Sequence, residues 1–350
     1  MVVPEYLHIY FDRTLKLEDV EYSEEEQEED EALMNALWPR AINNSTLIVM
    51  VVNMGQINLT LNSIESIRRQ GRLDNFFLFC LSQDVCDLLQ RHPHWKIPSA
   101  MVPLHWLDTD LRDTLTGGSL RKDYDWGGQK YILITNIKQV VVLRLLKEGF
   151  SVILTDADVV WMKQGVVENL LGMAKETPSQ VFFGSQENYM PDFLEPMVNS
   201  GFYLVRPTEL TLKLFDLTVA NQIVRHGNLA SQHVMNQAMD ILGMKTNGIH
   251  HRSSKFLDRD QYANGFDFFL EKTPQSKNIT PFTVHPNYIV GKANKEVTLR
   301  EFGLWFLTDS NSAPPAILEE PAPPATKDPA SLVTEEPSLS PTKLVPALSS

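Results

Sequence analysis

The stretch "GFSVILTDADVVWMK", residues 149 to 163, places two aspartates directly after an unbroken apolar run. The run from Val152 to Leu154 predicts a buried strand that ends at Asp156 and Asp158. On extended backbone, side chains two residues apart point to the same side and lie about 7 Å apart along the strand. Two buried carboxylates at that spacing repel each other unless a cation or a proton lies between them. We therefore expect this pair to hold a divalent cation.

Segments with the patterns of strands and helices alternate on both sides of this stretch. Strands are expected within residues 45–53, 75–82, 180–186 and 199–208. Helices are expected within residues 57–71, 83–92, 130–149, 210–224 and 231–242. This alternation is typical of an α/β domain whose mostly parallel sheet carries helices on its faces. In such sheets ligands bind beyond the carboxyl ends of the strands, where Asn53 and the two aspartates are expected.

Composition and charge divide the chain into three parts. Its 350 residues are 43% hydrophobic and 21% charged, as in an ordinary globular protein. Residues 18–31 hold ten acidic side chains and no basic one, which predicts a solvated, partly disordered segment over 1–44. The proline-rich residues 309–350 are expected to form a disordered tail. A single domain is expected over 45–308, and its near-neutral charge indicates no nucleic-acid partner.

The signals for cellular location point in different directions. No apolar stretch of 18 or more residues is present, so no membrane span is expected in this chain. The first residues lack the pattern of a signal peptide, which favours the cytoplasm. Four glycosylation sequons would matter only in a secreted protein, and they begin at Asn43, Asn44, Asn58 and Asn278. Cys80 and Cys86 are compatible with reduced core residues or with one short disulfide.

Asp156 and Asp158 form one of four Asp-x-Asp pairs in the chain. The other three lie in polar stretches and are expected in solvated loops: Asp108/Asp110, Asp123/Asp125 and Asp258/Asp260. A phosphatase of the haloacid-dehalogenase type also uses an Asp-x-Asp after four apolar residues, with a nucleophile and a general acid. That pattern requires the motif near the start of its domain, whereas here at least two strand–helix units precede it. In the other chemistry, a bound cation neutralises the diphosphate of a nucleotide sugar and stabilises the leaving group.

The second chemistry needs a further metal ligand and groups that bind the diphosphate. The stretch "HPNYIVGKANK", residues 285 to 295, supplies His285, Gly291 and Lys292, followed by Lys295. Manganese accepts an imidazole beside carboxylate oxygens, and lysine or backbone amides bind phosphates. A lone histidine after a strand is more often a plain polar residue. In combination with the aspartate pair and the Gly-Lys spacing, the ligand interpretation is favoured.

Four motifs, in this order, resemble the nucleotide-diphospho-sugar transferase family. They are "LLKEGFSVILTDADVVWMKQ", "NSGFYLVRPT", "SQHVMNQAM" and "HPNYIVGKANK". The family contains retaining glycosyltransferases of the glycosyltransferase A fold, grouped with glycosyltransferase family 77. Its members include plant xylosyl- and arabinosyltransferases and galactosyltransferases of protists. The resemblance covers about Thr46 to Phe306, and implies a single Rossmann-like domain, a UDP-sugar donor, a glycan or glycoprotein acceptor and a place in the Golgi lumen.

The resemblance also implies a role for each matching residue. Mn²⁺ (or Mg²⁺) would be bound by Asp156, Asp158 and His285, and the two aspartates would also contact the nucleotide sugar. The other matching residues would contact further parts of the donor: the nucleoside (Asn53), the side facing the helix before the metal strand (Lys138), the diphosphate (Gly291, Lys292) and the donor sugar (Asn199, Ser200, Gly201). Gln232 would lie near the reacting carbon. Local explanations remain open for several of them: a solvated helical lysine at 138, a turn at 199–201 and a surface helix residue at 232. Ser231 departs from the family, which commonly has aspartate there.

Retention of the anomeric configuration sets the expected mechanism. No carboxylate in these motifs is an obvious nucleophile, since the aspartate pair is committed to the metal. Departure and attack on the same face is therefore favoured, although a double displacement stays open. The alternatives to a transferase are the metal-dependent phosphatase and a non-catalytic nucleotide- or glycan-binding module, for which Ser231 is the hint.

Overall fold

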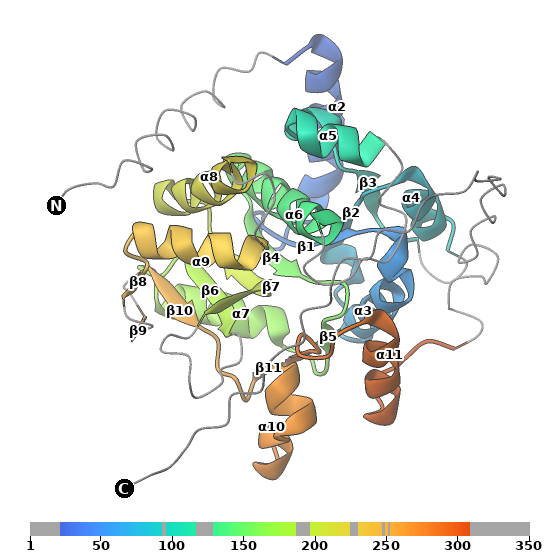
Figure 1. The fold of residues 1–350 in the computed structure, drawn as a ribbon, viewed down its shortest axis with the longest axis vertical. Helices are drawn as coiled ribbons and strands as arrows, with labels where there is room; N and C mark the ends of the chain where they lie inside the picture. The colour runs from blue at the N-terminus through green and yellow to red at the C-terminus, as the bar shows by residue number, and fades with distance from the viewer. Residues whose placement is uncertain are drawn as a thin grey trace, which may run out of the picture. The chain divides into compact units, whose positions relative to one another are not determined.

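The computed structural model describes residues 22–92, 96–116, 129–186, 197–224, 230–246, 249–250 and 253–308. The expected tail over 309–350, the first 21 residues and the Asp123/Asp125 pair lie outside these ranges. Figure 1 shows the arrangement of the described elements.

A seven-stranded sheet forms the centre of the fold, in the order β10-β6-β7-β4-β1-β2-β3. Its strands are β1 (Thr46–Val52), β2 (Phe76–Cys80), β3 (Ser99–Met101), β4 (Ser151–Thr155), β6 (Phe182–Gln186), β7 (Val198–Val205) and β10 (Ser254–Phe256). β1 pairs in parallel with both β2 and β4, whereas β7 runs antiparallel to β4 and β6. The prediction of a mostly parallel sheet is confirmed, with β7 as the reversed strand.

Helices cover both faces of this sheet (Figure 1). Alternate residues of β1 show why: Leu47 and Val49 pack into one apolar cluster, Ile48 and Met50 into another. The first cluster contains residues of α2 (Glu24–Leu37), α6 (Gln129–Lys147), α8 (Glu209–Val224) and α9 (Ser231–Ile241), with α5 (Thr109–Thr116) beside it. The second contains residues of α3 (Ile57–Arg69), α4 (Gln83–Gln90) and α7 (Val166–Glu176). Strands buried on both sides explain the continuous apolar runs in the sequence.

A second, three-stranded sheet has the order β11-β12-β5. β12 (Thr283–His285) runs parallel to β11 (Tyr262–Asn264) and antiparallel to β5 (Val160–Trp161). A π-helical turn, Phe266–Leu270, and the helices α10 (Thr273–Ser276) and α11 (Lys292–Glu301) flank it. Because β5 follows β4 after a few residues, this small sheet brings the late part of the chain to the end of β4. A two-stranded ribbon is formed by β8 (Lys245–Thr246) and β9 (Ile249–His250).

Part of the acidic segment forms a helix, which the sequence analysis did not predict. The helix α2 begins after Ser23, whose hydroxyl accepts from the Glu26 amide while the Glu26 carboxylate accepts from the Ser23 amide. This reciprocal capping and the acidic first turn both favour a helix start. Leu33 and Leu37, one turn apart, are buried against the domain. The segment is therefore an amphipathic helix with a solvated acidic face.

Cys80 and Cys86 form a disulfide between the end of β2 and the first turns of α4, with their Cα atoms 5.7 Å apart. Both cysteines are buried. Of the two states compatible with the sequence, the structure has the bridged one. In the part of the chain that the structure describes, no helix is both long and apolar enough to cross a bilayer.

Candidate active site

The aspartate pair lies on a turn after β4, at the carboxyl edge of the central sheet. The strand ends at Thr155, and the Val159 amide donates to the Asp156 carbonyl over 3.1 Å, which closes the turn. The prediction of extended backbone through Asp158 was wrong, because the chain must bend here to start β5. The bend nevertheless leaves both carboxylates on one side, where their oxygens come close to a third group.

That third group is His285, at the end of β12. The antiparallel pairing of β12 with β5 brings its Nε2 atom to 3.3 Å from the Asp158 Oδ1 atom. One ligand atom each from Asp156, Asp158 and His285 lies within 4.8 Å of the others. Asp158 and His285 are buried, and Asp156 is partly exposed. Two carboxylates and an imidazole at this separation fit a divalent cation such as Mn²⁺.

Two lysines lie against the carboxylates. The Lys138 Nζ atom, on α6, is 2.7 Å from the Asp156 Oδ1 atom, and the Lys295 Nζ atom, on α11, is 2.5 Å from the Asp158 Oδ2 atom. The Lys138 side chain is only 8% exposed, so it is not the solvated helical lysine that the sequence left open. Burial by itself would raise the pKa of the Asp158 carboxyl, but the Lys295 ammonium and the His285 ring hold that pKa well below its usual range. The site therefore keeps Asp158 ionised at neutral pH.

Gly201, in the middle of β7, leaves the space in which these groups meet. A Cβ atom at this position would lie 2.6 Å from the Asp156 Oδ2 atom, 2.9 Å from the Asn199 Oδ1 atom and closer still to the His285 ring. The Gly201 carbonyl also accepts from the Asp156 amide over 2.7 Å. Only glycine fits here, and the reason is the close approach of the side chains rather than the backbone angle.

The three residues expected around the donor sugar lie inside β7 rather than in a turn. The Gly201 amide donates to the Asn199 Oδ1 atom over 2.7 Å, so the Asn199 side chain folds along the strand. The Ser200 amide donates to the Gln232 Oε1 atom over 3.2 Å. Gln232, in the first turn of α9, is thereby joined to the strand and is not a plain surface residue. The buried Asn236 fixes α9 further by bonding the backbone of Val198 in both directions.

The other predicted diphosphate and nucleoside residues lie along the same edge. Asn53 is buried directly after β1. Lys292 donates to the Gly55 carbonyl over 2.9 Å and so joins the start of α11 to the loop that follows β1. Gly291 precedes α11 with φ of 86°, a conformation that favours glycine. Lys292 thus contacts backbone, whereas Lys295 contacts Asp158. The sequence analysis did not predict the contact between Lys295 and Asp158. Its signal was present: residues i and i+3 of one helix share a face.

A buried network supports the strand that carries His285. Asn264 is the register partner of His285, and its side chain donates to the Asp267 Oδ2 atom over 2.8 Å. Arg259 forms a bidentate ion pair with Asp267. The Gly265 amide donates to the Asn287 Oδ1 atom over 2.8 Å, just beyond His285. Sequence reasoning missed these residues because no local pattern connects them.

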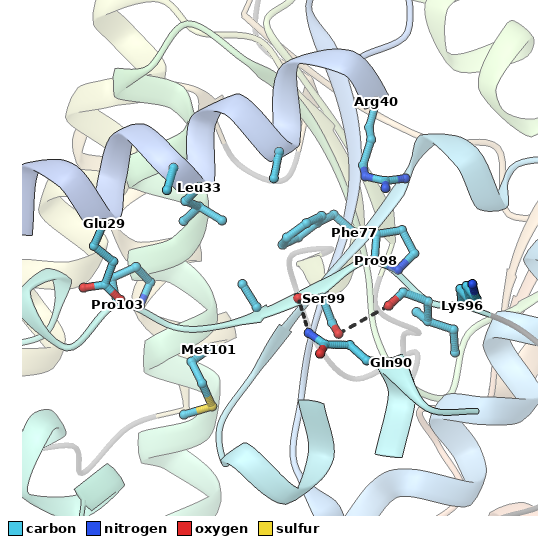
Figure 2. Close-up of a pocket in the computed structure, with 14 residues that line it drawn as sticks. Glu29, Leu33, Arg40, Phe77, Gln90, Lys96, Pro98, Ser99, Met101 and Pro103 are labelled. Atoms are coloured by element: carbon cyan, nitrogen blue, oxygen red, sulfur yellow. Dashed lines mark hydrogen bonds between the residues drawn. The ribbon is translucent and has the colours of Figure 1, made fainter. Parts of the chain in front are cut away.

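A separate pocket of about 590 Å³ lies between α2, α4 and β3 (Figure 2). Its floor includes Phe77, Ser99 and Met101, and the Gln90 side chain donates to the Ser99 carbonyl over 3.0 Å. None of the predicted site residues lines it. The candidate active site is therefore separate from this pocket.

Comparison with known proteins indicates the family to which this chain belongs. A UDP-galactose:fucoside alpha-3-galactosyltransferase of Dictyostelium discoideum is 25% identical over 77% of this chain and 44% of its own length. The beta-arabinofuranosyltransferase RAY1 of Arabidopsis thaliana is 24% identical over 76% of this chain and 48% of its own length. A UDP-D-xylose:L-fucose alpha-1,3-D-xylosyltransferase of the same plant is 21% identical over 76% and 71%. This chain thus spans about half the length of the first two relatives.

A family profile adds the decisive match. The profile described as nucleotide-diphospho-sugar transferase covers residues 82–299, more than half of the chain. That range contains the aspartate turn, β7, α9, His285 and Lys295. The family expected from the four motifs is therefore confirmed: this chain belongs to the nucleotide-diphospho-sugar transferases.

Proposed function

We propose that the protein is a metal-dependent retaining glycosyltransferase. It transfers a sugar of the xylose, arabinose or galactose class from a UDP-sugar to a glycan or glycoprotein acceptor. The observation that carries this proposal is the cluster of Asp156, Asp158 and His285 at the carboxyl edge of the sheet. The family match and the printed activities of the relatives support the donor class.

The cluster has the chemistry that a metal–diphosphate complex needs. Asp156, Asp158 and His285 would hold the cation, which would neutralise the diphosphate and stabilise it as it leaves. The chain supplies additional positive charge of its own through Lys138 and Lys295, both in contact with the carboxylates. Fixed charges that face a developing anion stabilise the transition state without reorganising.

The diphosphate and the nucleoside have their own residues in this proposal. Gly291 and Lys292 bind the diphosphate at the start of α11, where the backbone amides of the first turn add to the attraction. Asn53 contacts the nucleoside. The bond from Lys292 to the Gly55 carbonyl supports this arrangement, because it ties the diphosphate segment to the loop after β1.

The donor sugar would lie along β7 and α9. Asn199, Ser200 and Gly201 line it, and Gln232 stands near the reacting carbon. The bond between the Ser200 amide and the Gln232 side chain supports this placement, since it holds the two segments together. Ser231 is buried and stands where the family commonly has a carboxylate, so the contacts to the sugar hydroxyls differ here.

For the transfer itself we propose attack from the face that the diphosphate leaves. The acceptor oxygen forms a bond to the anomeric carbon while the bond from that carbon to the diphosphate oxygen breaks. The leaving diphosphate oxygen takes the proton of the acceptor hydroxyl. This route uses no protein nucleophile, since the acceptor oxygen itself attacks the anomeric carbon. Asp156 and Asp158 are both engaged by lysines, which supports a role for them other than nucleophile.

The proposed metal is Mn²⁺, with Mg²⁺ as the alternative, and the proposed compartment is the Golgi lumen. A buried imidazole beside two carboxylates favours Mn²⁺ over Mg²⁺, which prefers oxygen ligands. The buried Cys80–Cys86 disulfide supports an oxidising compartment over the cytoplasm.

A panel of nucleotide sugars tests the proposal without knowledge of the acceptor. Release of UDP from UDP-xylose, UDP-galactose and UDP-arabinose is measured with and without Mn²⁺, because a transferase that lacks its acceptor still hydrolyses some donor. We expect turnover of one donor, lost in Asp158→Ala. Asp260→Ala, which removes a partly exposed carboxylate paired with the exposed Lys277, is the matched control and should retain activity.

The same panel separates the alternatives. Cleavage of p-nitrophenyl phosphate without turnover of any donor would contradict the transferase activity and support a phosphatase. Binding of a UDP-sugar with no turnover, even with a mixture of glycan acceptors, would replace it by a binding module. Neither alternative is favoured by the family match.

A further inference from the structure

The four glycosylation sequons occupy very different positions in the fold. Asn43 and Asn44 lie at the tip of a tight turn, in which the Ser45 amide donates to the Ile42 carbonyl over 3.1 Å. Their φ angles of 52° and 59° are those of a turn with two left-handed central residues. Both residues are exposed.

Asn278 lies in a second exposed turn. It follows the short helix α10, has a φ angle of 55° and is exposed together with Thr280, the third residue of its sequon. The backbone around it is fixed: the Lys163 ammonium bonds the Thr280 carbonyl over 2.6 Å, and the Ile279 amide donates to the Pro274 carbonyl over 2.8 Å. The Asn278 side chain therefore projects from a rigid base.

Asn58 differs from these asparagines because its sequon is not exposed. It lies in the first turn of α3, and its Oδ1 atom is buried. Thr60, the third residue of that sequon, is fully buried, and its hydroxyl donates to the Gln56 carbonyl over 3.0 Å. Asn58 itself is only partly exposed, so the sequon offers less accessible surface than the two exposed turns.

The exposed sequons also precede strands whose carboxyl ends are followed or formed by candidate site residues. Asn44 lies two residues before β1, whereas Asn53 directly follows its last residue, and seven strand residues span about 23 Å. Asn278 lies before β12, whereas His285 ends that strand. Bulky groups at these two turns leave the carboxyl edge of the sheets open.

From these positions we propose that Asn278 and the Asn43–Asn44 turn accept N-linked oligosaccharides and that Asn58 does not. In the modification, the Asn Nδ2 atom forms a bond to the anomeric carbon of a lipid-diphosphate-linked oligosaccharide. The bond from that carbon to the diphosphate oxygen breaks, the lipid diphosphate leaves, and the side-chain amide loses one proton. The turn at Asn43 and Asn44 carries one glycan, because two on adjacent residues would collide.

The test is a site map of the full chain produced behind a secretion signal in eukaryotic cells. Both secreted and cell-retained chains are treated with peptide-N-glycosidase, and the asparagines converted to aspartate are located by mass spectrometry. We expect conversion at Asn278 and at one of Asn43 and Asn44, with Asn58 unchanged. Conversion at Asn58, or an unmodified Asn278, would overturn the proposal.

Variants add a second readout. Asn278→Gln and Thr280→Ala should each remove the same single glycan, and the double change Asn43→Gln with Asn44→Gln should remove the other. Asn58→Gln should leave the glycan mass unchanged. The Asn278→Gln chain should hydrolyse donor at the wild-type rate, because Asn278 lies at the edge away from the donor. A rate more than about tenfold lower in a folded Asn278→Gln chain would contradict that placement.

Discussion

The helix α2 and the turn at Asp156 and Asp158 are both acidic, but their negative charges are stabilised in different ways. The α2 glutamates are mostly solvated, and Ser23 and Glu26 cap the helix start with two backbone bonds. Asp158 is buried and Asp156 is partly exposed, and each has a lysine within 2.7 Å. Water can screen the first group, whereas the second must be paired by protein or by a bound cation. Acidic residues in a sequence thus indicate function only when the fold removes them from water.

Glu65 on α3 is an intermediate case. Its side chain is 4% exposed and accepts from both Arg68 and Arg69, its neighbours on the same helix. It has charge partners from its own element, whereas Asp158 has partners from α11 and β12. A buried carboxylate with complete local pairing leaves no place for a ligand.

The largest effect is expected from Asp158→Asn. Loss of one carboxylate ligand should weaken Mn²⁺ binding, measured by calorimetry, by about 10³-fold, since a metal–ligand contact is worth several kcal/mol. Asp260→Asn is the control, because its partner Lys277 is exposed. Equal Mn²⁺ affinity in wild type and Asp158→Asn would contradict the assignment of the metal to this site.

Gly201→Ala should come next. The added Cβ would overlap the Asp156 and His285 side chains, so we expect about 1–3 kcal/mol lower unfolding free energy and about 10²-fold lower donor hydrolysis. Denaturant unfolding and the UDP-release assay measure the two quantities. Gly172→Ala is the matched control: it lies within α7, no atom lies within 4 Å of its Cβ position, and alanine favours a helix, so stability should rise by about 0.5–1 kcal/mol. A fully active, stable Gly201→Ala chain would contradict the close packing.

Lys295→Met and Lys292→Met compare the two lysines of α11. We expect each to raise the KM for the donor by about 10–100-fold, the value of a charge-assisted hydrogen bond. Only Lys295→Met should also alter Mn²⁺ affinity, because only Lys295 contacts Asp158. Donor KM values and Mn²⁺ titrations of both variants measure these two effects. An unchanged KM in Lys292→Met would transfer the proposed diphosphate role to Lys295.

A smaller, pH-dependent effect is expected at Glu65. Burial by itself would raise the pKa of the Glu65 carboxyl, but the bonds from Arg68 and Arg69 lower it below its usual value. A folded-state pKa below the unfolded value stabilises the protein above the unfolded pKa, and this stabilisation is lost as the pH falls through the folded pKa. Glu65→Gln should therefore lower the unfolding free energy by about 1 kcal/mol at pH 7, with the difference narrowing below pH 4.3. A difference that does not change with pH would assign the effect to packing.

The smallest effect is expected from Ser23→Ala at the start of α2. Loss of the side-chain cap should cost about 1 kcal/mol of local helix stability, seen as faster amide exchange in the first turns of α2. Donor hydrolysis should not change, since α2 lies away from the candidate site. Altered donor turnover would show that the acidic helix is coupled to catalysis.

Several features of the fold could be predicted because their signals are local. The helices α3 and α6 are followed by Gly71 and Gly149, each with positive φ, as the glycine positions in the sequence indicated. The apolar runs of β1, β2 and β4 became central strands. The order inside α2 was missed although Ser23 and Glu26 have the spacing of a capping box, because the density of charge outweighed that signal.

The sequence by itself determined the types of the elements and the aspartate pair after β4. These depend on periodicity, caps and apolar runs, which act over a few residues. Only the tertiary structure decided which partners these aspartates have. Lys138 approaches from α6, Gly201 from the reversed strand β7, and Lys295 from α11. The chain reaches α11 through the pairing of β12 with β5, which involves two residue pairs. Such short pairings have no signature in the local sequence, because they are stabilised by the core that forms around them and not by the propensity of the residues that pair.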